Sequence, residues 1–573
     1  MTLKASEDII DVRRNEIRTN KKGSSFVRVY GLDTETCKGK PMTLQFSDGE
    51  KDQIFFVNQR TITKKFLTLL SKLPSPKHEK SIIYVLNLLF DFCQCFYPHW
   101  KTLIQQEKKD GQFDFKVVGW NIKGFITEDS QFAEITRGKK VFWLVDIGRF
   151  FIGISLDRAI KTLLHEKGKE KPPKKLGNKM FTKNDKKFVK YALWDVHKTQ
   201  QIGKLITEFH NKWDIVQTWS IAQMAEKIFR HHFLKENIKG CPYEIIRPAL
   251  YSYHGGRNAF YNRPNLFKSC YSYDLVSAYS FAMVNLPNFQ GCEYYRVKKY
   301  EPKFCGIYKI SGFKKTCKYP AFFANHFKEI KGKFEDVWIT SFELKQALKY
   351  KEVKIDKIEG YIVYPKNKEK TALQKYVEAF VKLKKDTPKD QVYYEFYKRL
   401  LNALYGKFIQ MREVKIDADN KKWITGQMFQ PFIASLITGY VRAMIHDLEH
   451  KFKSIHTSTD SIKTLKPIPE KYFSKELGGL SLEVKGKCLI LRNRLYLHFN
   501  GNKIDFSKDK KGEYIHLKKY ALHGFKGKPE VLYKIWKEGK REYIANRMIK
   551  PKEAIVQGKN PFVFEDQKRS LNF

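Results

Sequence analysis

One aspartate of this chain lies in the middle of an apolar run. Asp91 follows Leu88, Leu89 and Phe90 in the segment LNLLFDF, which covers residues 86–92. An ionised carboxylate in apolar surroundings is costly unless a cation accompanies it. The fold must therefore bring a cation to Asp91.

Three other acids and a tyrosine occur in patterns that suit the same cation. Asp33 and Glu35 are two residues apart on an expected strand, so both project from one face. Tyr191 and Asp195 are four residues apart on a helix expected over 186–209, and they share a helical face. The four acids would bind two divalent ions, one generating hydroxide and one stabilising the leaving oxygen of a phosphodiester. Taken alone, a DxE pair is ordinarily a solvated strand end.

A second group of residues combines two acids with a polar helix face. Asp274 and Asp460 each lie at an expected strand end, among small and β-branched residues. Between them, one face of an expected helix carries Lys398, Asn402, Tyr405 and Gly406. A lysine for a triphosphate, an aromatic ring for a nascent base pair and a glycine that leaves room for it would explain this face. Turn aspartates and an amphipathic core helix are the alternatives.

The charge balance indicates a polyanionic partner. Lys+Arg 108 against Asp+Glu 61 gives a net charge of +47 in 573 residues, which is typical of nucleic-acid binding, with acidic lipid as an alternative. Hydrophobic residues make up 42% and aromatic residues 15%, so the charge belongs to a folded surface. The 9 cysteines form no CxxC pair, which predicts a reducing compartment such as the cytoplasm. We expect no signal peptide and no membrane span.

The chain reads as a mixed α+β protein of several domains, without an internal repeat. Met1–Ser25 is a polar extension of unknown role, and 165–179 is a solvated loop. Further helices are expected over 159–164, 341–350, 371–385 and 391–408, and strands over 271–279, 303–313, 357–365, 456–465 and 488–499.

In order along the chain, these residues resemble the protein-primed family B DNA polymerases of phages, adenoviruses and linear plasmids. The resemblance runs from about Phe26 to the C-terminus. The exonuclease motifs DxE, Nx2-3(F/Y)D and Yx3D of that family fall on Asp33/Glu35, on Asn87/Phe90/Asp91 and on Tyr191/Asp195. Its YxGG, Dx2SLYP, Kx3NSxYG and KxY motifs are similar to Tyr253–Gly256, Asp274–Ser280, Lys398–Gly406 and Arg494–Tyr496.

The resemblance implies a fold class and a division of the chain. We expect a ribonuclease H-like 3′→5′ exonuclease domain followed by a right-hand polymerase with palm, fingers, thumb and a palm insertion. The implied ranges are 1–25 for the extension, 26–215 for the exonuclease, 216–287 for linker and palm, 288–372 for the first insertion, 373–411 for the fingers, 412–500 for a reduced second insertion and palm, and 501–573 for the thumb.

It also implies a role for each matching residue. Asp274 and Asp460 would hold two Mg²⁺ ions, with Mn²⁺ as an alternative, and the four exonuclease acids would hold two more. Tyr191 would orient the attacking water, and Tyr279 would exclude ribonucleotides. The nucleotide-contacting set is Tyr279, Lys398, Asn402, Tyr405 and Gly406, and the DNA-contacting set is Thr36, Asn87, Phe90, Lys161, Tyr253, Gly255, Gly256, Arg494 and Tyr496. In that lysine-rich stretch, Lys161 is equally well explained as a solvated helix residue.

Several positions depart from the family pattern. Ser458 replaces the first acid of YxDTDS, which predicts altered metal affinity or preference. Ser280 replaces a proline, Ala403 a serine and Arg494 a lysine, and arginine keeps the charge with a planar, forked geometry.

Two segments bear on how synthesis starts and continues. From Asp274 to Asn402 there are 128 residues, enough for the insertion that in the family holds the priming protein. From Gly406 to Asp460 there are only 54, so the second insertion is reduced to a hairpin around 412–426. The sequence alone therefore does not predict that this protein shares the strong processivity and strand displacement of the family.

The partners expected are primer–template and single-stranded DNA, dNTPs and a terminal priming protein, and the enzyme is expected to be a monomer. Synthesis without a protein primer, or a degenerate polymerase that binds single-stranded DNA, remain the alternatives.

Overall fold

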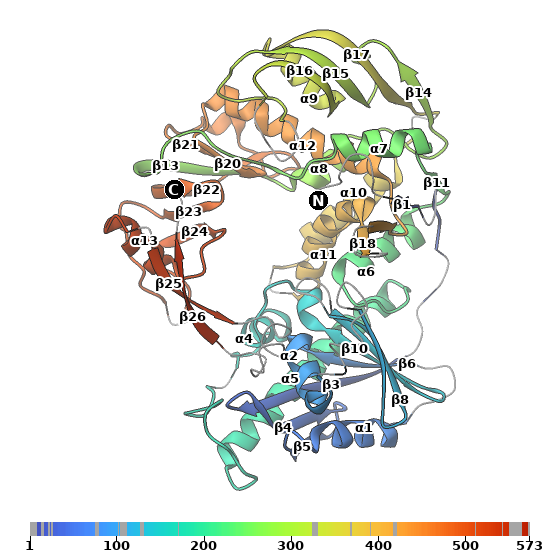
Figure 1. The fold of residues 1–573 in the computed structure, drawn as a ribbon, viewed down its shortest axis with the longest axis vertical. Coiled ribbons are helices and arrows are strands. Elements are labelled where there is room, and N and C mark those ends of the chain that lie inside the picture. The colour runs from blue at the N-terminus through green and yellow to red at the C-terminus, as the bar shows by residue number, and fades with distance from the viewer. Residues whose placement is uncertain are drawn as a thin grey trace.

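The computed structural model places two large sheets in separate halves of the molecule, with the N-terminal half below and the C-terminal half above in Figure 1. The structure describes residues 9–12, 16–20, 23, 27–74, 80–100, 102, 112–126, 131–169, 171–323, 330–366, 369–389, 391–415, 421–509, 512–540, 542–548 and 564–570. Among these, no helix is long and apolar enough to cross a membrane.

The N-terminal half is built on an eight-stranded sheet of order β5-β4-β3-β6-β10-β9-β8-β7. Only the β3–β6 and β6–β10 pairs are parallel. The strands are β3 (Val27–Cys37), β4 (Lys40–Ser47), β5 (Asp52–Phe56), β6 (Lys80–Val85), β7 (Gln112–Val117), β8 (Trp120–Ile126), β9 (Gln131–Arg137) and β10 (Lys140–Asp146).

Helices cover both faces of this sheet. α1 (Ile62–Lys72) and α2 (Leu88–Cys95) share an apolar core with the sheet, and the long α5 (Lys186–Lys212) lies on the opposite face, next to β3. Gly31 allows this close approach, because a Cβ there would lie 2.6 Å from the Val196 carbonyl oxygen of α5. Short helical turns join these elements: η1 (Tyr97–His99), η2 (Ile147–Arg149), α4 (Leu156–Ala159) and η3 (Ile160–Leu164).

The C-terminal half contains a seven-stranded antiparallel sheet of order β12-β20-β21-β13-β22-β23-β24. Its strands are β12 (Arg257–Phe260), β13 (Asn265–Leu275), β20 (His456–Thr459), β21 (Ser461–Thr464), β22 (Leu480–Arg492), β23 (Leu495–Phe499) and β24 (Leu517–Leu522). The strand expected over 456–465 is in fact a tight hairpin with Asp460 between β20 and β21. Thr459 takes a positive φ of 59° at this turn.

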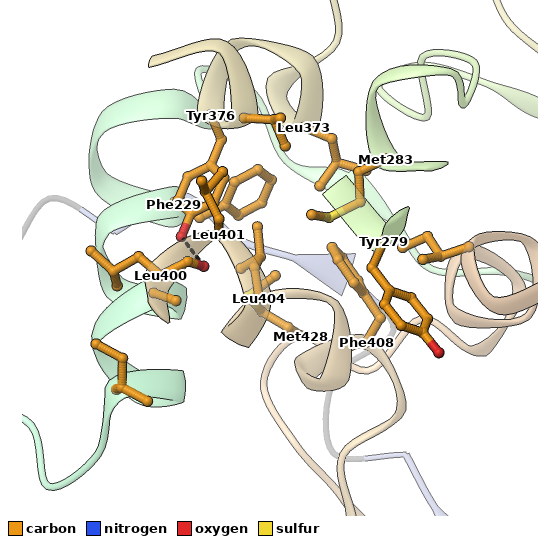
Figure 2. Close-up of a cluster of buried hydrophobic side chains, with 14 of the residues drawn as sticks. Phe229, Tyr279, Met283, Leu373, Tyr376, Leu400, Leu401, Leu404, Phe408 and Met428 are labelled. Carbon is orange, nitrogen blue, oxygen red and sulfur yellow. Dashed lines mark hydrogen bonds between the residues drawn. The ribbon is translucent and has the colours of Figure 1, made fainter. Parts of the chain in front are cut away.

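A bundle of helices packs beside this sheet and shares an apolar core with it. Figure 2 shows side chains of this core. Tyr376 of the bundle donates a hydrogen bond from its hydroxyl to the Leu400 carbonyl oxygen (2.9 Å). The helices are α6 (Ile221–Ile228), η4 (Phe229–Phe233), α7 (Tyr243–Ser252), α8 (Ala278–Val284), α10 (Ala372–Asp386), α11 (Val392–Ala403), η6 (Tyr405–Ile409), α12 (Pro431–Phe452) and η7 (Glu470–Tyr472).

The helix expected over 391–408 is interrupted. The α-helical part, α11, ends at Ala403, and Tyr405–Ile409 form a 3-10 turn, η6. Gly406 disfavours a continued α-helix because glycine loses more backbone entropy than any other residue when a helix fixes its conformation. Lys398 and Asn402 therefore share a helix, whereas Tyr405 does not extend their face.

The insertion expected over 288–372 contains its own sheet, which lies at the far end of the C-terminal half (Figure 1). Its strand order is β14-β17-β15-β16, all antiparallel, with α9 (Ser341–Lys349) packed on it. The strands are β14 (Glu293–Val297), β15 (Gly306–Lys314), β16 (Gly332–Thr340) and β17 (Val353–Tyr364).

The described strands of the N-terminal extension pair with strands far along the chain. β1 (Ile9–Asp11) adds in parallel to β19 (Lys421–Thr425), which forms a hairpin with β18 (Met411–Lys415). β2 (Glu16–Ile17) pairs with β11 (Ile238–Lys239). The hairpin expected around 412–426 is therefore present and carries a third strand from the start of the chain.

The C-terminal part is small and strand-rich. α13 (Pro529–Lys537) packs against β23 and β24, and β25 (Glu542–Met548) pairs with β26 (Phe564–Ser570). This region descends from the seven-stranded sheet toward the N-terminal half (Figure 1). The predicted domain ranges stay predictions. Two of their boundaries fall inside α10 and β18, and β24 of the seven-stranded sheet falls in the range predicted for the thumb.

Candidate active sites

The first acid cluster forms where β3 meets α5. Carboxylate oxygens of Asp33, Glu35 and Asp195 lie within 4.8 Å of one another. Asp33 and Glu35 meet because alternate residues of β3 face the same way, and α5 adds Asp195 across the close contact at Gly31. Oxygen-rich groups of this kind suit Mg²⁺ or Mn²⁺.

Asp91 lies beside this cluster, deep in the protein. It is 2% exposed, near the start of α2, and its Oδ1 accepts a hydrogen bond from the Thr34 hydroxyl (2.7 Å). Thr34 lies between Asp33 and Glu35, so one strand segment presents two acids and holds a third. The apolar run around Asp91 thus becomes α2, with its acid turned toward β3.

Burial and repulsion raise the pKa values of these acids. The pKa of Asp33 is raised by burial first and then by Asp91, Glu35 and Asp195. Burial raises the pKa of Glu35 to about 7, against the lowering effect of Lys169. Such a group resists ionisation without a cation, so the donor set fits divalent ions.

Lys169 is a member of this site that sequence reasoning missed. Its ammonium group forms an ion pair with Asp195 and lies 4.7 Å from the centre of the Tyr191 ring. Its backbone N–H donates to Asp157 Oδ1 (2.8 Å). Lys161, the predicted lysine, pairs instead with Asp157 (2.6 Å). Only the path of the 165–179 loop distinguishes the two lysines, and composition does not encode that path.

The other predicted exonuclease residues lie on the same elements. Thr36 follows Glu35 on β3, and Phe90 is the neighbour of Asp91 on α2. Asn87 caps α2 with a positive φ of 70°, and its backbone N–H donates to Asp146 Oδ1 (3.3 Å). Asp146 also accepts from the Leu88 N–H (3.0 Å) and thereby fixes the start of α2.

The second acid cluster lies at one end of the seven-stranded sheet. Asp274 is near the end of β13, in register with Ser461 of β21 and Ser481 of β22. Asp460 is in the turn before β21, and its carbonyl oxygen accepts a hydrogen bond from the Leu275 N–H (2.9 Å). Burial, followed by Asp460, raises the pKa of Asp274 to about 7. Burial also raises the pKa of Asp460. This pair likewise fits divalent ions.

Two further charged groups complete this site and were not predicted. Lys519 of β24 lies 3.7 Å from Asp274 Oδ1 and forms an ion pair with Glu483 of β22. Glu483 raises the pKa of both Asp274 and Asp460. The alternation of side chains along β22 could have predicted the face of the sheet on which Glu483 lies. It could not have predicted that β24 places Lys519 beside Glu483.

Ser458 lies next to the turn that carries Asp460. It lies on β20, in register with Asn258 of β12 and Ser461 of β21. Its carbonyl oxygen accepts a hydrogen bond from the Ser461 hydroxyl (3.0 Å), which closes the turn around Asp460.

Two stacked tyrosines border the second cluster. The rings of Tyr279 and Tyr405 are 4.2 Å apart and nearly parallel, at 4°. Tyr279 packs at the edge of the helical bundle with its hydroxyl turned away from it (Figure 2). Gly256 allows this arrangement, because a Cβ there would lie 2.6 Å from Thr459 and 3.0 Å from the Tyr279 hydroxyl. The predicted Tyr253–Gly256 segment thus lies directly against the turn that carries Asp460.

A buried arginine holds this segment in place. Arg442 of α12 makes two hydrogen bonds to the Glu343 carboxylate of α9, from Nε (2.7 Å) and from Nη2 (2.9 Å). Its Nη1 also donates to the carbonyl oxygens of His254 and Gly255. Arg442 is 2% exposed and Glu343 also 2%. Through these hydrogen bonds, Arg442 joins Glu343 of the insertion to the Tyr253–Gly256 segment beside the second acid cluster.

The remaining predicted residues divide between surface and interior. Lys398, Asn402 and Gly406 are exposed on or just after α11, where a ligand can reach them. Arg494 forms the turn between β22 and β23 with a positive φ of 57°. Tyr496 is only 3% exposed, with the Lys463 ammonium 4.1 Å from its ring centre, so it supports the sheet from within.

Comparisons with known proteins agree with this architecture. The family model for DNA polymerase type B, organellar and viral, matches residues 156–426. A primer-independent DNA polymerase PolB of Escherichia coli is 26% identical over 276 residues, which cover 42% of this chain and 30% of that protein. A DNA polymerase of Acidianus bottle-shaped virus is 26% identical over 441 residues, which cover 68% of this chain and 63% of that protein. The chain thus spans less than two thirds of the length of either relative.

Solved structures show the same fold over nearly the whole chain. Phi29 DNA polymerase complexed with primer–template DNA and incoming nucleotides matches with a TM-score of 0.68 and 14% identity, over 96% of this chain and 100% of that one. The binary complex of the same enzyme with primer–template DNA matches with a TM-score of 0.66 and 15% identity, over 95% and 99%. The fold is therefore an exonuclease domain followed by palm, fingers and thumb, as predicted. The chain is thus similar in fold to phi29 DNA polymerase, and its residues 156–426 match the family model for DNA polymerase type B, organellar and viral.

Proposed function

We propose that this chain is a DNA-templated DNA polymerase that also carries a 3′→5′ proofreading exonuclease. The observation that supports this most is the presence of two separate acid clusters, each on a different sheet of one chain. Asp33, Glu35, Asp91 and Asp195 belong to the eight-stranded sheet and α5, and Asp274 and Asp460 to the seven-stranded sheet. One active site for DNA synthesis and a second one for 3′→5′ cleavage account for the two clusters.

The residues of the chain have distinct tasks in this proposal. Divalent ions bound by the acids would supply hydroxide for cleavage and charge neutralisation for nucleotide transfer. Tyr191 and Lys169 position the attacking water and the scissile phosphate beside Asp195. Tyr279, stacked on Tyr405, closes the space where a ribose 2′-hydroxyl would lie. The exposed Lys398 contacts the triphosphate.

The test is a labelled primer–template with Mg²⁺, with and without dNTPs. We expect Asp460→Ala to abolish extension and leave degradation intact, and Asp33→Ala to do the reverse. Asp505→Ala, which removes an acid bonded to Ser507 outside both clusters, is the control and keeps both activities. A wild-type protein that binds and trims DNA but never extends it, even with Mn²⁺, would favour the degenerate-polymerase alternative.

How synthesis starts is a finer proposal. We propose that the insertion sheet β14–β17 helps to hold a priming protein, because it lies between Asp274 and the α11 residues in sequence and is fastened to the Tyr253–Gly256 segment through Arg442. The E. coli relative is named for primer-independent synthesis, which favours the alternative start. Radiolabelled dNTP on a template without primer distinguishes them: a nucleotide covalently bound to a partner protein supports protein priming, and a free oligonucleotide contradicts it.

A further inference from the structure

A group of metal-ligating side chains lies away from both acid clusters, where the insertion meets α12. His446 and His450 are four residues apart on α12, so both imidazoles face the insertion. Glu352, which precedes β17, lies opposite them, and ligand atoms of the three residues lie within 4.8 Å of one another. None of these residues takes part in the proposed polymerase or exonuclease chemistry.

A fourth donor atom, the carbonyl oxygen of Tyr319, completes the group. His446 Nε2 lies 2.8 Å from Glu352 Oε1 and 3.0 Å from the Tyr319 carbonyl oxygen. His450 Nε2 lies 3.5 Å from the same carboxylate oxygen and 3.1 Å from the same carbonyl oxygen. Two nitrogens and two oxygens thus converge on one small volume.

These separations are close to those between the ligands of a tetrahedral zinc ion. Zinc binds imidazole nitrogen and carboxylate oxygen at about 2.0–2.2 Å, which places neighbouring ligands of a tetrahedron ~3.3 Å apart. The four distances between nitrogen and oxygen donors run from 2.8 to 3.5 Å. Two imidazoles with one carboxylate is also a donor set that zinc favours over Mg²⁺.

The surroundings hold the donors in place. Glu352 Oε2, the oxygen turned away from the histidines, accepts a hydrogen bond from the Ala321 N–H (2.7 Å) and lies 3.8 Å from the Lys314 ammonium. The His450 ring stacks on Tyr350 at 3.8 Å between centroids. Orientation of metal ligands by such outer contacts is typical of protein metal sites. The side chain of His450 is 22% exposed, which gives an ion a way in.

We propose that His446, His450, Glu352 and the Tyr319 carbonyl bind one Zn²⁺ ion that fastens the insertion to α12. The four donors come from three segments: Tyr319 and Glu352 lie on two segments of the insertion, and both histidines lie on the long helix α12. The ion would act as a structural clamp with all four positions filled by protein. It would hold the insertion at a second point, separate from the Arg442–Glu343 pair.

The test uses Co²⁺ as the probe on the full, chelator-treated chain. Tetrahedral Co²⁺ gives strong visible d–d absorption, whereas the oxygen-rich acid clusters give only weak octahedral bands. We expect one equivalent of tetrahedral Co²⁺, displaced by one equivalent of Zn²⁺, and a Zn²⁺-dependent rise in melting temperature. His450→Gln and Glu352→Gln should lose the band, and His450→Cys should keep it and add sulfur-to-cobalt charge transfer.

Matched controls separate this site from the others. His231→Gln removes a helical histidine that lies 3.8 Å from a single carboxylate, that of Asp214, and should leave the band unchanged. Asp33→Asn and Asp274→Asn should also leave it unchanged. A wild-type chain without a tetrahedral band would overturn the proposal and leave the cluster as a hydrogen-bond network, and a band that survives both His450→Gln and Glu352→Gln would overturn it as well.

Discussion

The two acid clusters of this protein use similar groups but differ in how deeply one acid of each is buried. Asp195 of the exonuclease-domain cluster has a side chain only 2% exposed, whereas that of Asp274 in the palm is 32% exposed. Among the described residues, a lysine lies at each cluster, Lys169 from a loop in the first and Lys519 from a strand in the second. Screening by water weakens ion pairs between exposed groups. Removing the lysine should therefore reduce activity more in the cluster of the buried Asp195, called the closed cluster below.

The largest expected effect is on the closed cluster. Lys169→Met removes the only cation that lowers the pKa values of both Asp33 and Glu35 among the contributions resolved for them. We expect exonuclease activity to fall about 10²-fold, within the range for loss of one electrostatic stabiliser. Extension should be unchanged, and the pH at half-maximal cleavage should move upward. Lys161→Met is the matched control, and an equal loss there would contradict the assignment to Lys169.

The corresponding change in the palm should be smaller. Lys519→Met leaves Asp274 without its lysine, and we expect extension to fall about 10-fold with degradation unchanged, since water partly replaces the lost charge. Single-turnover incorporation with Mg²⁺ measures it. A loss as large as that of Lys169→Met would show that exposure does not set the size of the effect.

The raised pKa of Asp274 makes metal-free stability depend on pH. Its folded pKa of about 7 exceeds the unfolded value near 4, so the folded state binds more protons between these limits and loses stability as pH rises through them. In EDTA at pH 8, Asp274→Asn should therefore stabilise the chain, on the order of 1 kcal/mol after allowance for partial exposure. The gain should disappear near pH 4. Thermal melts across this range measure it, with Asp505→Asn as control.

The smallest effect concerns the N-terminal extension. Ile10→Pro removes a backbone donor from β1 and should weaken its pairing with β19 by about 1 kcal/mol. Hydrogen exchange of residues 421–425 should speed up, whereas the amides of β3 should not change. Equal exchange in wild type and variant would mean that the extension contributes no stability there.

The sequence predicted which acids lie together in the first cluster because they occur in local patterns. The two-residue spacing of Asp33 and Glu35 on a strand, and the four-residue spacing of Tyr191 and Asp195 on a helix, fix which side chains face together. Asp91 in its apolar run signalled a buried charge. The long helices α5 and α10 could be predicted for the same reason, since their apolar periodicity is local.

Tertiary structure alone decided which distant groups complete the sites. Lys169, Lys519 and Glu483 are ordinary members of a strongly basic chain, and only the loop path and the strand order bring them to the acids. The hairpin turn at Asp460 also depended on tertiary contacts, because the Leu275 N–H of β13 supplies a partner for its backbone. Likewise the residues of β1 pair with residues of β19 that lie 413 positions further along the chain, and no local pattern indicates that pairing. Spacing along one element fixes a shared face, but long-range pairing depends on the path of the whole chain.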